Sequence, residues 1–315
     1  MTIHSQSYTP AKVAVVVPTY NCAQYLERAL ASVTAQTYRD SQLFVIDDGS
    51  TDDTEDIVAK FTCVFQKQQH AGQAAARNRG ISISSSPYVA FLDADDAWLP
   101  PKLEQQIAFL DRHPEVGLVC CDCADGSSEP VARSAPCVPQ YLGFEHLVRE
   151  CFIFTPTVVV RRECLDECGG FNESLKVSED FNLWLKIASR WEIAVISETL
   201  AVRYKRPESL SLTIKPDQAC VQGIAALEDV IRSCPQLRRA QRGAINRELA
   251  IRYYTYGSLL FSAAHPRESR PKLIAAWRYQ PWNWRAFAKY GTSFLPTSLR
   301  NALIAAYRTA NVPSR

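Results

Sequence analysis

The chain has 315 residues, of which 47% are hydrophobic and 22% are charged, and its formal net charge is +2 at pH 7. The composition is that of a folded globular protein with room for one large domain or two moderate ones, and the near-neutral charge argues against a protein built to wrap nucleic acid. No stretch reaches the roughly 18 to 20 apolar residues of a membrane span, so any membrane contact is expected to be peripheral.

Cysteine usage predicts a reducing compartment. The chain has eleven cysteines, and its first residues, MTIHSQSYTPAK, lack an apolar segment, so we expect a cytoplasmic protein. Cys120, Cys121 and Cys123 cluster, and Cys164 and Cys168 lie four apart. A zinc site usually shows two Cys-x-x-Cys pairs, so buried reduced thiols are the favoured interpretation.

The first part of the chain alternates strands and helices. Residues 12–17 predict a strand of valines, and Asn21 is expected to cap the following helix. After a second strand over 43–46, residues 50–53 predict a capping box for a helix that runs to Lys60. Repeated units of this kind predict a parallel sheet with right-handed crossovers. The alternation continues with a strand over 63–65, a helix over 72–83, a strand over 89–92, a helix around 103–110 and a strand over 116–121.

The next part of the chain is less regular. Residues 122–140 are rich in Gly, Ser, Pro and Ala and predict an exposed loop. The β-branched and aromatic residues 152–160 predict a strand, and a connecting segment over 161–173 follows. A helix is expected to open at 178–180.

Beyond Pro216 apolar residues recur only at helical spacing, so we expect a first domain over 1–215 and a helical region over 216–315. From Arg267 to the chain end, nine basic residues and several aromatics oppose one acid, Glu268. Basic aromatic helices bind anionic membrane surfaces. A helical subdomain packed on the sheet, with its charges in solvent, is the alternative.

The stretch with the clearest chemistry is residues 89–96, an apolar strand that runs directly into acids. Asp93 and Asp95 lie two apart, so their side chains point roughly the same way in an extended chain, and ligands collect at the carboxyl ends of parallel strands. Carboxylate oxygens suit Mg²⁺ or Mn²⁺, which commonly also bind phosphate. Taken alone, the motif is more often a solvated turn that caps the next helix.

Five short motifs stand in order along the chain. They are Pro18-Thr19-Tyr20-Asn21, Asp47-Asp48-Gly49-Ser50, Ala76-Arg77-Asn78, Asp93-Ala94-Asp95-Asp96 and Glu179-Asp180. In this order the chain resembles a bacterial family 2 glycosyltransferase of the GT-A fold, from roughly Val13 to Val202. The resemblance implies an α/β fold with a mostly parallel sheet, helices on both faces and a C-terminal helical extension. It also implies transfer of a sugar from a nucleotide diphosphate by one inverting displacement.

The resemblance implies nucleotide-sugar contacts for the early motifs. Pro18, Thr19 and Tyr20 are expected to hold the base and ribose. Asp48 would accept a hydrogen bond from the base, and a uracil N–H would suit it, which favours a UDP-sugar. Arg77 would pair with the diphosphate. Without the resemblance, Pro18 is interpreted as a strand terminator and Tyr20 as an aromatic residue at the rim. Asp48 is then a turn residue, and Arg77 lies on a solvated helix face.

The resemblance also implies the catalytic groups. Asp93 and Asp95 would bind Mg²⁺ or Mn²⁺, with Asp93 also close to the donor and Asp95 the more direct ligand. Asp180 would be the general base that takes the proton from the acceptor hydroxyl, and Glu179 would orient it. Without the resemblance, Glu179 and Asp180 are helix caps.

Some positions depart from the family or have two interpretations. His70 stands where the family usually has Asn, and Ile187 stands where processive relatives have the Gln of Gln-x-x-Arg-Trp, which predicts single addition. Trp98 is expected beside the transferred sugar, where it and residues 169–171 would wall the acceptor pocket; core packing is the alternative for Trp98.

Other functions fit the sequence less well. A dinucleotide-dependent oxidoreductase or a sugar nucleotidyltransferase needs a glycine-rich first turn, and this chain has Pro-Thr-Tyr-Asn. A catalytically degenerate nucleotide-sugar or glycan-binding protein on the same fold stays open. We expect a glycan or lipid-linked acceptor in polysaccharide biosynthesis, with peripheral contact at the inner face of the cell membrane as a further option, and no nucleic-acid partner.

Overall fold

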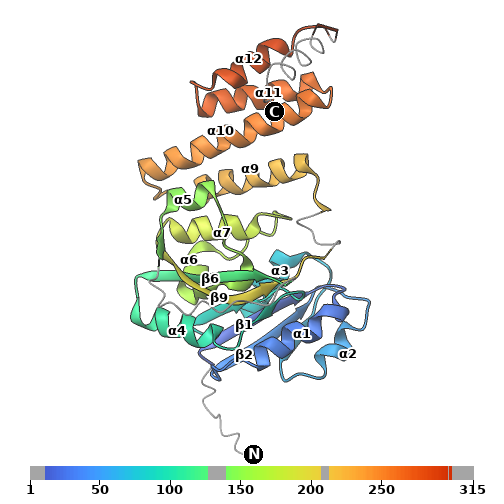
Figure 1. Ribbon diagram of the computed structural model, residues 1–315, viewed down its shortest axis with the longest axis vertical. Coiled ribbons are helices and arrows are strands. Elements are labelled where there is room, and N and C mark those ends of the chain that lie inside the picture. Colours follow the sequence, from blue (N-terminus) through green and yellow to red (C-terminus); the bar gives the residue numbers. More distant parts are fainter. Residues whose placement is uncertain (1–10, 127–139, 207–212, 297, 300–315) are drawn as a thin grey trace, which may run out of the picture. The chain divides into compact units, whose positions relative to one another are not determined.

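The computed structural model describes residues 11–126, 140–206, 213–296 and 298–299 (Figure 1). The chain separates into two compact units, one of residues 1–213 with 232–236 and the other of residues 214–231 with 237–315. The assignment of catalysis to residues 1–215 stays a prediction.

A single sheet forms the centre of the first unit. Its strands are β1 (Val13–Thr19), β2 (Ser41–Asp47), β3 (Val64–Lys67), β4 (Tyr88–Phe91), β5 (Ala97–Trp98), β6 (Val116–Asp125), β7 (Gln140–Leu142), β8 (Val159–Arg161) and β9 (Glu192–Arg203). They run in the order β3-β2-β1-β4-β8-β6-β9-β5, with β7 on β9. The β3-β2-β1-β4 part is parallel, as predicted, whereas β8 runs antiparallel between β4 and β6. The mixed α/β fold with a mostly parallel sheet is thereby confirmed.

Helices cover both faces of this sheet (Figure 1). They are α1 (Ala23–Thr34), α2 (Thr54–Val58), α3 (Gln73–Ile83), α4 (Lys102–Arg112), α5 (Phe144–Arg149), α6 (Arg162–Cys168) and α7 (Glu179–Ala188). Because side chains alternate along a strand, Val15 and Val17 of β1 pack with α1, α2 and α4 in one core. Val16 points to the other face, where a Cβ on Gly80 of α3 would come within 2.4 Å of it. The glycine therefore lets α3 lie directly on the sheet.

The turns after β1 and β2 differ from the prediction. Asn21 does not cap α1; it has φ 48°, and its Oδ1 accepts the backbone N–H of Thr51 at 2.9 Å. Ser50 does not cap α2, because its Oγ accepts the backbone N–H of Asn21 at 2.9 Å. The two turns thus bind each other, and Cys22 and Asp53 stand at the helix starts instead.

The later part of the sheet also differs. The expected strand over 152–160 is mostly absent, because Pro156 lies in a 3-10 turn, η1 (Thr155–Thr157), and only the last two residues enter β8. The sequence analysis does not predict the long strand β9. The loop expected over 122–140 begins as the end of β6, and its residues 127–139 lie outside the described residues.

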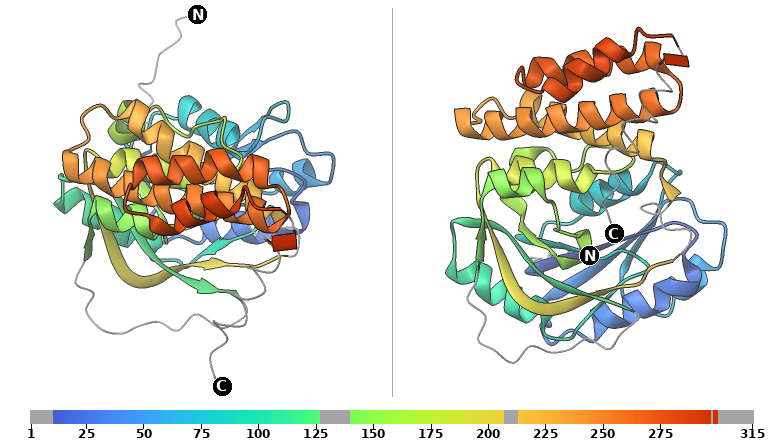
Figure 2. Two further views of the ribbon diagram at one scale, coloured as in Figure 1. Left: turned by 90° about the horizontal axis from the view of Figure 1, so that it is seen from above. Right: turned by 45° about the horizontal axis from the view of Figure 1, so that its top comes forward.

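The described part of the second unit is helical, as predicted (Figures 1 and 2). Its helices are α9 (Pro216–Ser233), α10 (Arg239–Ser262), α11 (Pro266–Tyr279) and α12 (Trp284–Thr292). α10 and α11 pack closely at Gly257, where an added Cβ would lie 3.0 Å from Leu273. Arg270 joins α11 to α12 by donating to the Oγ and carbonyl of Ser293 at 3.1 and 2.9 Å. None of the helices described has the length and apolar character needed to cross a bilayer.

Candidate active site

Asp48 organises the loop that leads into α3. It follows β2 and is buried, and its Oδ1 accepts hydrogen bonds from the Gln68 side chain at 2.8 Å and the Ala71 backbone N–H at 2.9 Å. Its Oδ2 accepts the Gly72 backbone N–H at 2.8 Å and lies 2.8 Å from Nδ1 of His70. The loop can turn here because Gly72 has φ 99°. A base N–H that bonds to Asp48 therefore needs one of these partners to leave.

Tyr20 is the exposed member of the first motif. Its ring is stacked on His70 with centroids 4.2 Å apart and planes at 25°. Pro18 and Thr19 are buried inside β1, so their predicted contact with base and ribose cannot come from freely exposed side chains. Tyr20, at 44% exposure, is the one side chain of the three that presents a face to a ligand.

Arg77 connects two acidic segments that are far apart in sequence. Its Nη2 donates to Oδ1 of Asp93 and its Nη1 to Oε1 of Glu179, each at 2.7 Å. The residue is 2% exposed. Burial works against its charge, but the two carboxylates outweigh burial and raise the pKa of Arg77. The guanidinium is thus not a solvated group, and its buried Nε has no hydrogen-bond partner among the described residues.

The acids after β4 form a tight turn, in which the Asp96 backbone N–H donates to the Asp93 carbonyl at 3.1 Å. Oδ2 of Asp95 lies 2.6 Å from Nε of Arg206, and Arg28 donates to the Asp95 carbonyl at 2.5 Å. Each of the two predicted metal ligands, Asp93 and Asp95, therefore has an arginine partner in the structure.

The carboxyl groups of this turn hold their protons more tightly than free carboxyl groups do. Burial, with the added charges of Asp93 and Asp95, raises the pKa of Asp96 to about 8. Burial and the charge of Asp93 also raise the pKa of Asp95, against the pull of Arg206. Burial and repulsion between neighbouring carboxylates both favour the protonated forms of these acids.

The other predicted acids open α7, where Ser178 adopts φ 66°. Glu179 is buried and accepts hydrogen bonds from Arg77 and from Nε2 of Gln73, the latter at 2.8 Å. Burial raises the pKa of Glu179 to about 7, although Arg77 opposes the shift. Asp180 accepts the Phe181 backbone N–H at 2.7 Å, so part of the predicted helix-start role is present.

Asp180 lies within electrostatic range of the acidic turn. Burial raises its pKa, Arg77 lowers it, and the charge of Asp93 raises it further. A carboxylate with a raised pKa beside a cluster of acids has the character of a proton acceptor. The structure thus brings Asp93 and Glu179 together at Arg77, and Asp180 follows Glu179 in α7.

The aromatic wall predicted for the acceptor pocket is not found where it was expected. Trp98 is 3% exposed, and its indole N–H donates to the Pro156 carbonyl at 2.7 Å. Phe171 is also buried and makes edge contacts with Phe91 and Trp184. Core packing, the alternative interpretation of Trp98, is correct.

Among the described residues, no three His, Cys, Asp or Glu side chains are arranged to hold a metal ion. Cys120, Cys121 and Cys164 are buried free thiols. Burial raises the pKa of Cys121 to about 11, which keeps it protonated. The favoured interpretation of the cysteines as small buried hydrophobes agrees with these properties.

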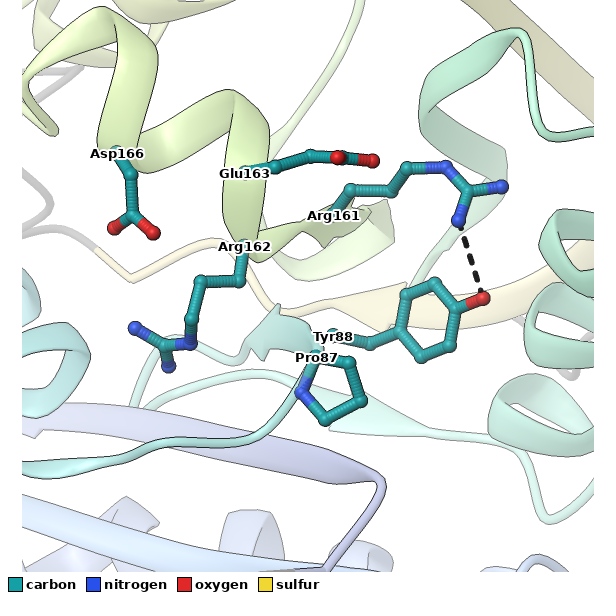
Figure 3. A pocket seen from close by; sticks show the side chains of 6 residues that line it. All are labelled: Pro87, Tyr88, Arg161, Arg162, Glu163 and Asp166. Carbon is teal, nitrogen blue, oxygen red and sulfur yellow. Dashed lines mark hydrogen bonds between the residues drawn. The ribbon is translucent and has the colours of Figure 1, made fainter.

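A cavity of about 330 Å³ lies at the opposite end of β4 (Figure 3). It is lined by Pro87, Tyr88, Arg161, Arg162, Glu163 and Asp166. Arg161 donates to the carbonyls of Val116 and Leu110 at 2.7 and 2.6 Å, and Arg162 donates to that of Ser86 at 2.6 Å. None of the predicted site residues lines this cavity.

Sequence reasoning missed three side chains that touch the site and gave a fourth, His70, no role in it. Arg28 and Arg206 contact Asp95, Gln73 contacts Glu179, and His70 covers Tyr20. His70 was noticed only as a departure from the family. The arginines carried no signal, because each lies more than 60 positions from Asp95 along the chain.

Solved structures share this architecture. The chain is similar to TarS of S. aureus in complex with UDP-GlcNAc, with a TM-score of 0.73 and 20% identity over 96% of this chain and 93% of that one. It is also similar to the mannosyltransferase PcManGT from Pyrobaculum calidifontis in complex with GDP-Man and Mn²⁺, with a TM-score of 0.52 and 21% identity over 88% of each chain. These likenesses establish the GT-A glycosyltransferase fold.

The chain belongs to glycosyl transferase family 2, whose sequence model matches residues 14–167. An uncharacterised glycosyltransferase of Nostoc sp. is 34% identical over 50% of this chain and 52% of its own length. Two Escherichia coli relatives, WfgD and WfaP, are named UDP-Glc:alpha-D-GlcNAc-diphosphoundecaprenol beta-1,3-glucosyltransferases. WfgD is 30% identical over 59% of this chain and 73% of its own length, and WfaP is 27% identical over 82% and 98%. The chain spans about half or less of the first three curated relatives it matches.

Proposed function

We propose that the protein is an inverting, metal-dependent glycosyltransferase. It moves one hexose from a nucleotide-diphosphate donor to a hydroxyl of a glycan or lipid-linked acceptor in polysaccharide biosynthesis. Residues 1–215 are proposed as the catalytic domain. The observation that carries the proposal is the buried Arg77, which holds the acidic turn after β4 against the start of α7.

The roles divide between these two segments. Asp180 accepts the proton of the acceptor hydroxyl as that oxygen attacks the anomeric carbon. Glu179, held by Arg77 and Gln73, fixes the helix start that carries Asp180. Because base and acidic turn come from different elements, the base can act on the sugar face opposite the leaving diphosphate.

The residues of the turn fit a divalent cation. Their donors are hard carboxylate oxygens, and a bound cation would offset the burial and repulsion that raise the pKa of Asp95 and of Asp96. Asp93 and Asp95 would hold the Mg²⁺ or Mn²⁺, and Arg77 and Arg206 would have to yield part of their contacts. The ion, when bound, would supply charge neutralisation for the departing diphosphate. The Mn²⁺ in the similar archaeal structure supports this choice.

The donor is proposed to be a UDP-sugar. Once His70 has moved away from both residues, the Asp48 carboxylate can accept a hydrogen bond from a nucleobase. The Tyr20 ring can then stack on the same base. The UDP-GlcNAc in the similar S. aureus structure and the UDP-Glc in the names of the E. coli relatives support a uridine nucleotide.

The acceptor is proposed to be lipid-linked, because the two E. coli relatives are named for an acceptor on diphosphoundecaprenol. A cytoplasmic protein that reaches such an acceptor would contact the inner face of the membrane peripherally. Ile187 in place of a Gln favours a single addition.

The alternative is a catalytically degenerate protein that binds nucleotide sugars or glycans on the same fold. Asp93, Asp95 and Asp180 together favour an enzyme, since a binding protein has no need of the proton acceptor.

The test is a panel of nucleotide sugars screened for Mg²⁺- or Mn²⁺-dependent thermal stabilisation, followed by transfer assays on the stabilising donors. We expect UDP-sugars to stabilise the protein only with metal and to be turned over. Stabilisation without turnover of any donor, with or without acceptor, would favour the degenerate binder.

A further inference from the structure

The second unit carries an unusual exposed aromatic surface at the junction of α11 and α12. Trp277 is 45% exposed, Trp282 90%, Trp284 70% and Phe287 65%. Three of the six tryptophans of the chain lie here within eight positions. We call these four residues the tryptophan face. A single exposed aromatic side chain is ordinary on a protein surface, but four of them in one short stretch of sequence are typical of a binding surface.

Helix α12 is oriented with its apolar side outward. Trp284, Phe287, Ala288 and Gly291 recur at helical spacing, and all are exposed. An amphipathic helix normally turns such a stripe to the core, so a missing contact partner is the simplest reason for this orientation.

The opposite side of α12 anchors it to α10. Lys289 donates from Nζ to Oγ of Ser258 at 3.0 Å and lies 5.2 Å from the ring centroid of Tyr254, while Ala286 is buried. The apolar stripe therefore cannot turn inward without breaking these contacts.

The turn that presents Trp282 is held in place. The Asn283 backbone N–H donates to the Gln280 carbonyl at 2.9 Å, and the Asn283 side chain accepts the Ala286 backbone N–H at 3.2 Å, which caps α12. The exposure of Trp282 is thus a property of an ordered turn.

Positive charge surrounds the tryptophan face. Arg278 and Arg285 are exposed, and Arg285 lies 5.8 Å from the ring centroid of Trp284. From residue 266 onward the sequence has a single acid, Glu268, and that carboxylate lies 3.2 Å from Nδ1 of His265. A partner for this surface must accept tryptophan rings and carry negative charge.

We infer that the tryptophan face docks on an anionic lipid surface. Tryptophan prefers the boundary between headgroups and acyl chains, and arginine at its margin pairs with anionic headgroups. A second copy of the chain is a poorer partner, because a two-fold contact through this face would bring Arg278 and Arg285 of both copies together. The biological purpose of this docking rests on the proposed lipid-linked acceptor. The docking itself is argued from the exposed tryptophan and arginine side chains.

The experiment is co-sedimentation of the full-length protein with vesicles of phosphatidylglycerol and phosphatidylcholine, and with vesicles of phosphatidylcholine alone. No donor or acceptor is present, so failure here leaves the transferase proposal intact. The variant Trp282→Ser/Trp284→Ser removes the most exposed rings. The matched control, Ile251→Ser/Leu259→Ser, removes two exposed apolar residues of α10, which are 54% and 37% exposed.

We expect binding to the anionic vesicles, weakened by salt, and a loss of roughly tenfold or more in the tryptophan variant, because the binding free energy follows the apolar area buried. The control should bind like the parent, and both variants should keep the parent's melting temperature. Arg278→Gln/Arg285→Gln should reduce the salt dependence.

Three results would overturn the inference. They are absence of vesicle binding by the parent protein, an equal loss in the α10 control, and sedimentation of the parent as a dimer that the tryptophan variant dissociates. The last would assign the face to a second copy of the chain.

Discussion

Arginines and acids lie at both ends of β4, but the arginines have different hydrogen-bond partners at each end. At the start of the strand, Arg161 and Arg162 donate mainly to backbone carbonyls, with Glu163 and Asp166 at the cavity rim (Figure 3). At its end, Arg77 donates to carboxylates, and acids outnumber it.

This difference in hydrogen-bond partners distinguishes Arg161, which has a structural role, from Arg77, whose contacts can change when a ligand binds. A buried carbonyl needs a hydrogen-bond donor, so Arg161 is a structural residue. A carboxylate can exchange its arginine for a metal ion or accept a proton, and burial raises the pKa of Asp96 and of Glu179 at this end.

The largest expected effect is that of Asp180→Asn. Loss of the general base should lower the kcat of transfer by roughly 100- to 10,000-fold while donor binding persists. Transfer assays and donor titrations measure the two separately. Glu163→Gln, at the other end of β4, is the control and should transfer at the parent rate. Near-parental transfer by Asp180→Asn would remove Asp180 from the role of base.

Arg77→Met should destabilise the fold by about 3 to 5 kcal/mol, because it leaves Asp93 and Glu179 without their buried partner. It should also abolish metal-dependent donor binding. Arg161→Met should cost stability too, yet any folded protein should keep its kcat/KM. Urea unfolding with activity measured at low temperature compares the two variants. An equal loss of kcat/KM in Arg77→Met and Arg161→Met would mean that the two ends of β4 do not differ in function.

Asp95→Ala tests the metal role. For the parent, metal with donor at about 100 times its Kd should add about 2.7 kcal/mol of stability, and the variant should show none of this metal-dependent gain. Thermal unfolding with and without a chelator measures it. A full metal response in the variant would place the ion elsewhere.

The pH dependence follows from the raised pKa of Asp180. Its ionised form is the base, so kcat/KM should fall as pH decreases through a value above the ordinary Asp pKa of about 4. The folded state binds this proton more tightly than the unfolded state does, so the charged carboxylate costs stability as pH rises past the unfolded pKa. Asp180→Asn should therefore raise Tm at neutral pH, and the gain should shrink in acid. A Tm of Asp180→Asn below that of the parent at neutral pH would contradict the predicted direction of this effect.

The smallest expected effect is that of His70→Ala. A base that enters at Tyr20 and Asp48 has to displace the imidazole from both, at a cost near that of one hydrogen bond, about 1 kcal/mol. The variant should bind UDP roughly fivefold more tightly in calorimetric titration. Weaker binding would mean that His70 stays and contacts the base.

The parallel β3-β2-β1-β4 part of the sheet could be predicted from sequence, because apolar runs and turn residues alternate regularly there. The link from Asp93 through Arg77 to Glu179 brings together two segments that only the family resemblance, which ordered the motifs, had placed in one site. Which cation pairs with which acid could not be predicted, since Arg77 reaches Asp93 and Glu179 from a helix whose rotation depends on Gly80 packing on Val16.

Trp98 and β9 show the two ways in which local patterns failed. Trp98 stands next to the acids in sequence, yet it turns into the core because its indole N–H finds the Pro156 carbonyl. β9 mixes polar and apolar residues, and its pairing with β6, β5 and β7 comes from distant parts of the chain. Contacts of this range leave little trace in a local window of sequence.

The most direct test of a single displacement assisted by Asp180 is the anomeric configuration of the product. The full-length protein would be given UDP-α-D-glucose, Mg²⁺ or Mn²⁺ and a GlcNAc-diphospho-lipid acceptor, and the product linkage read from the proton coupling at the anomeric carbon. We predict a β linkage, formed by inversion. An α linkage would contradict the mechanism, because a single in-line displacement assisted by Asp180 must invert the anomeric carbon.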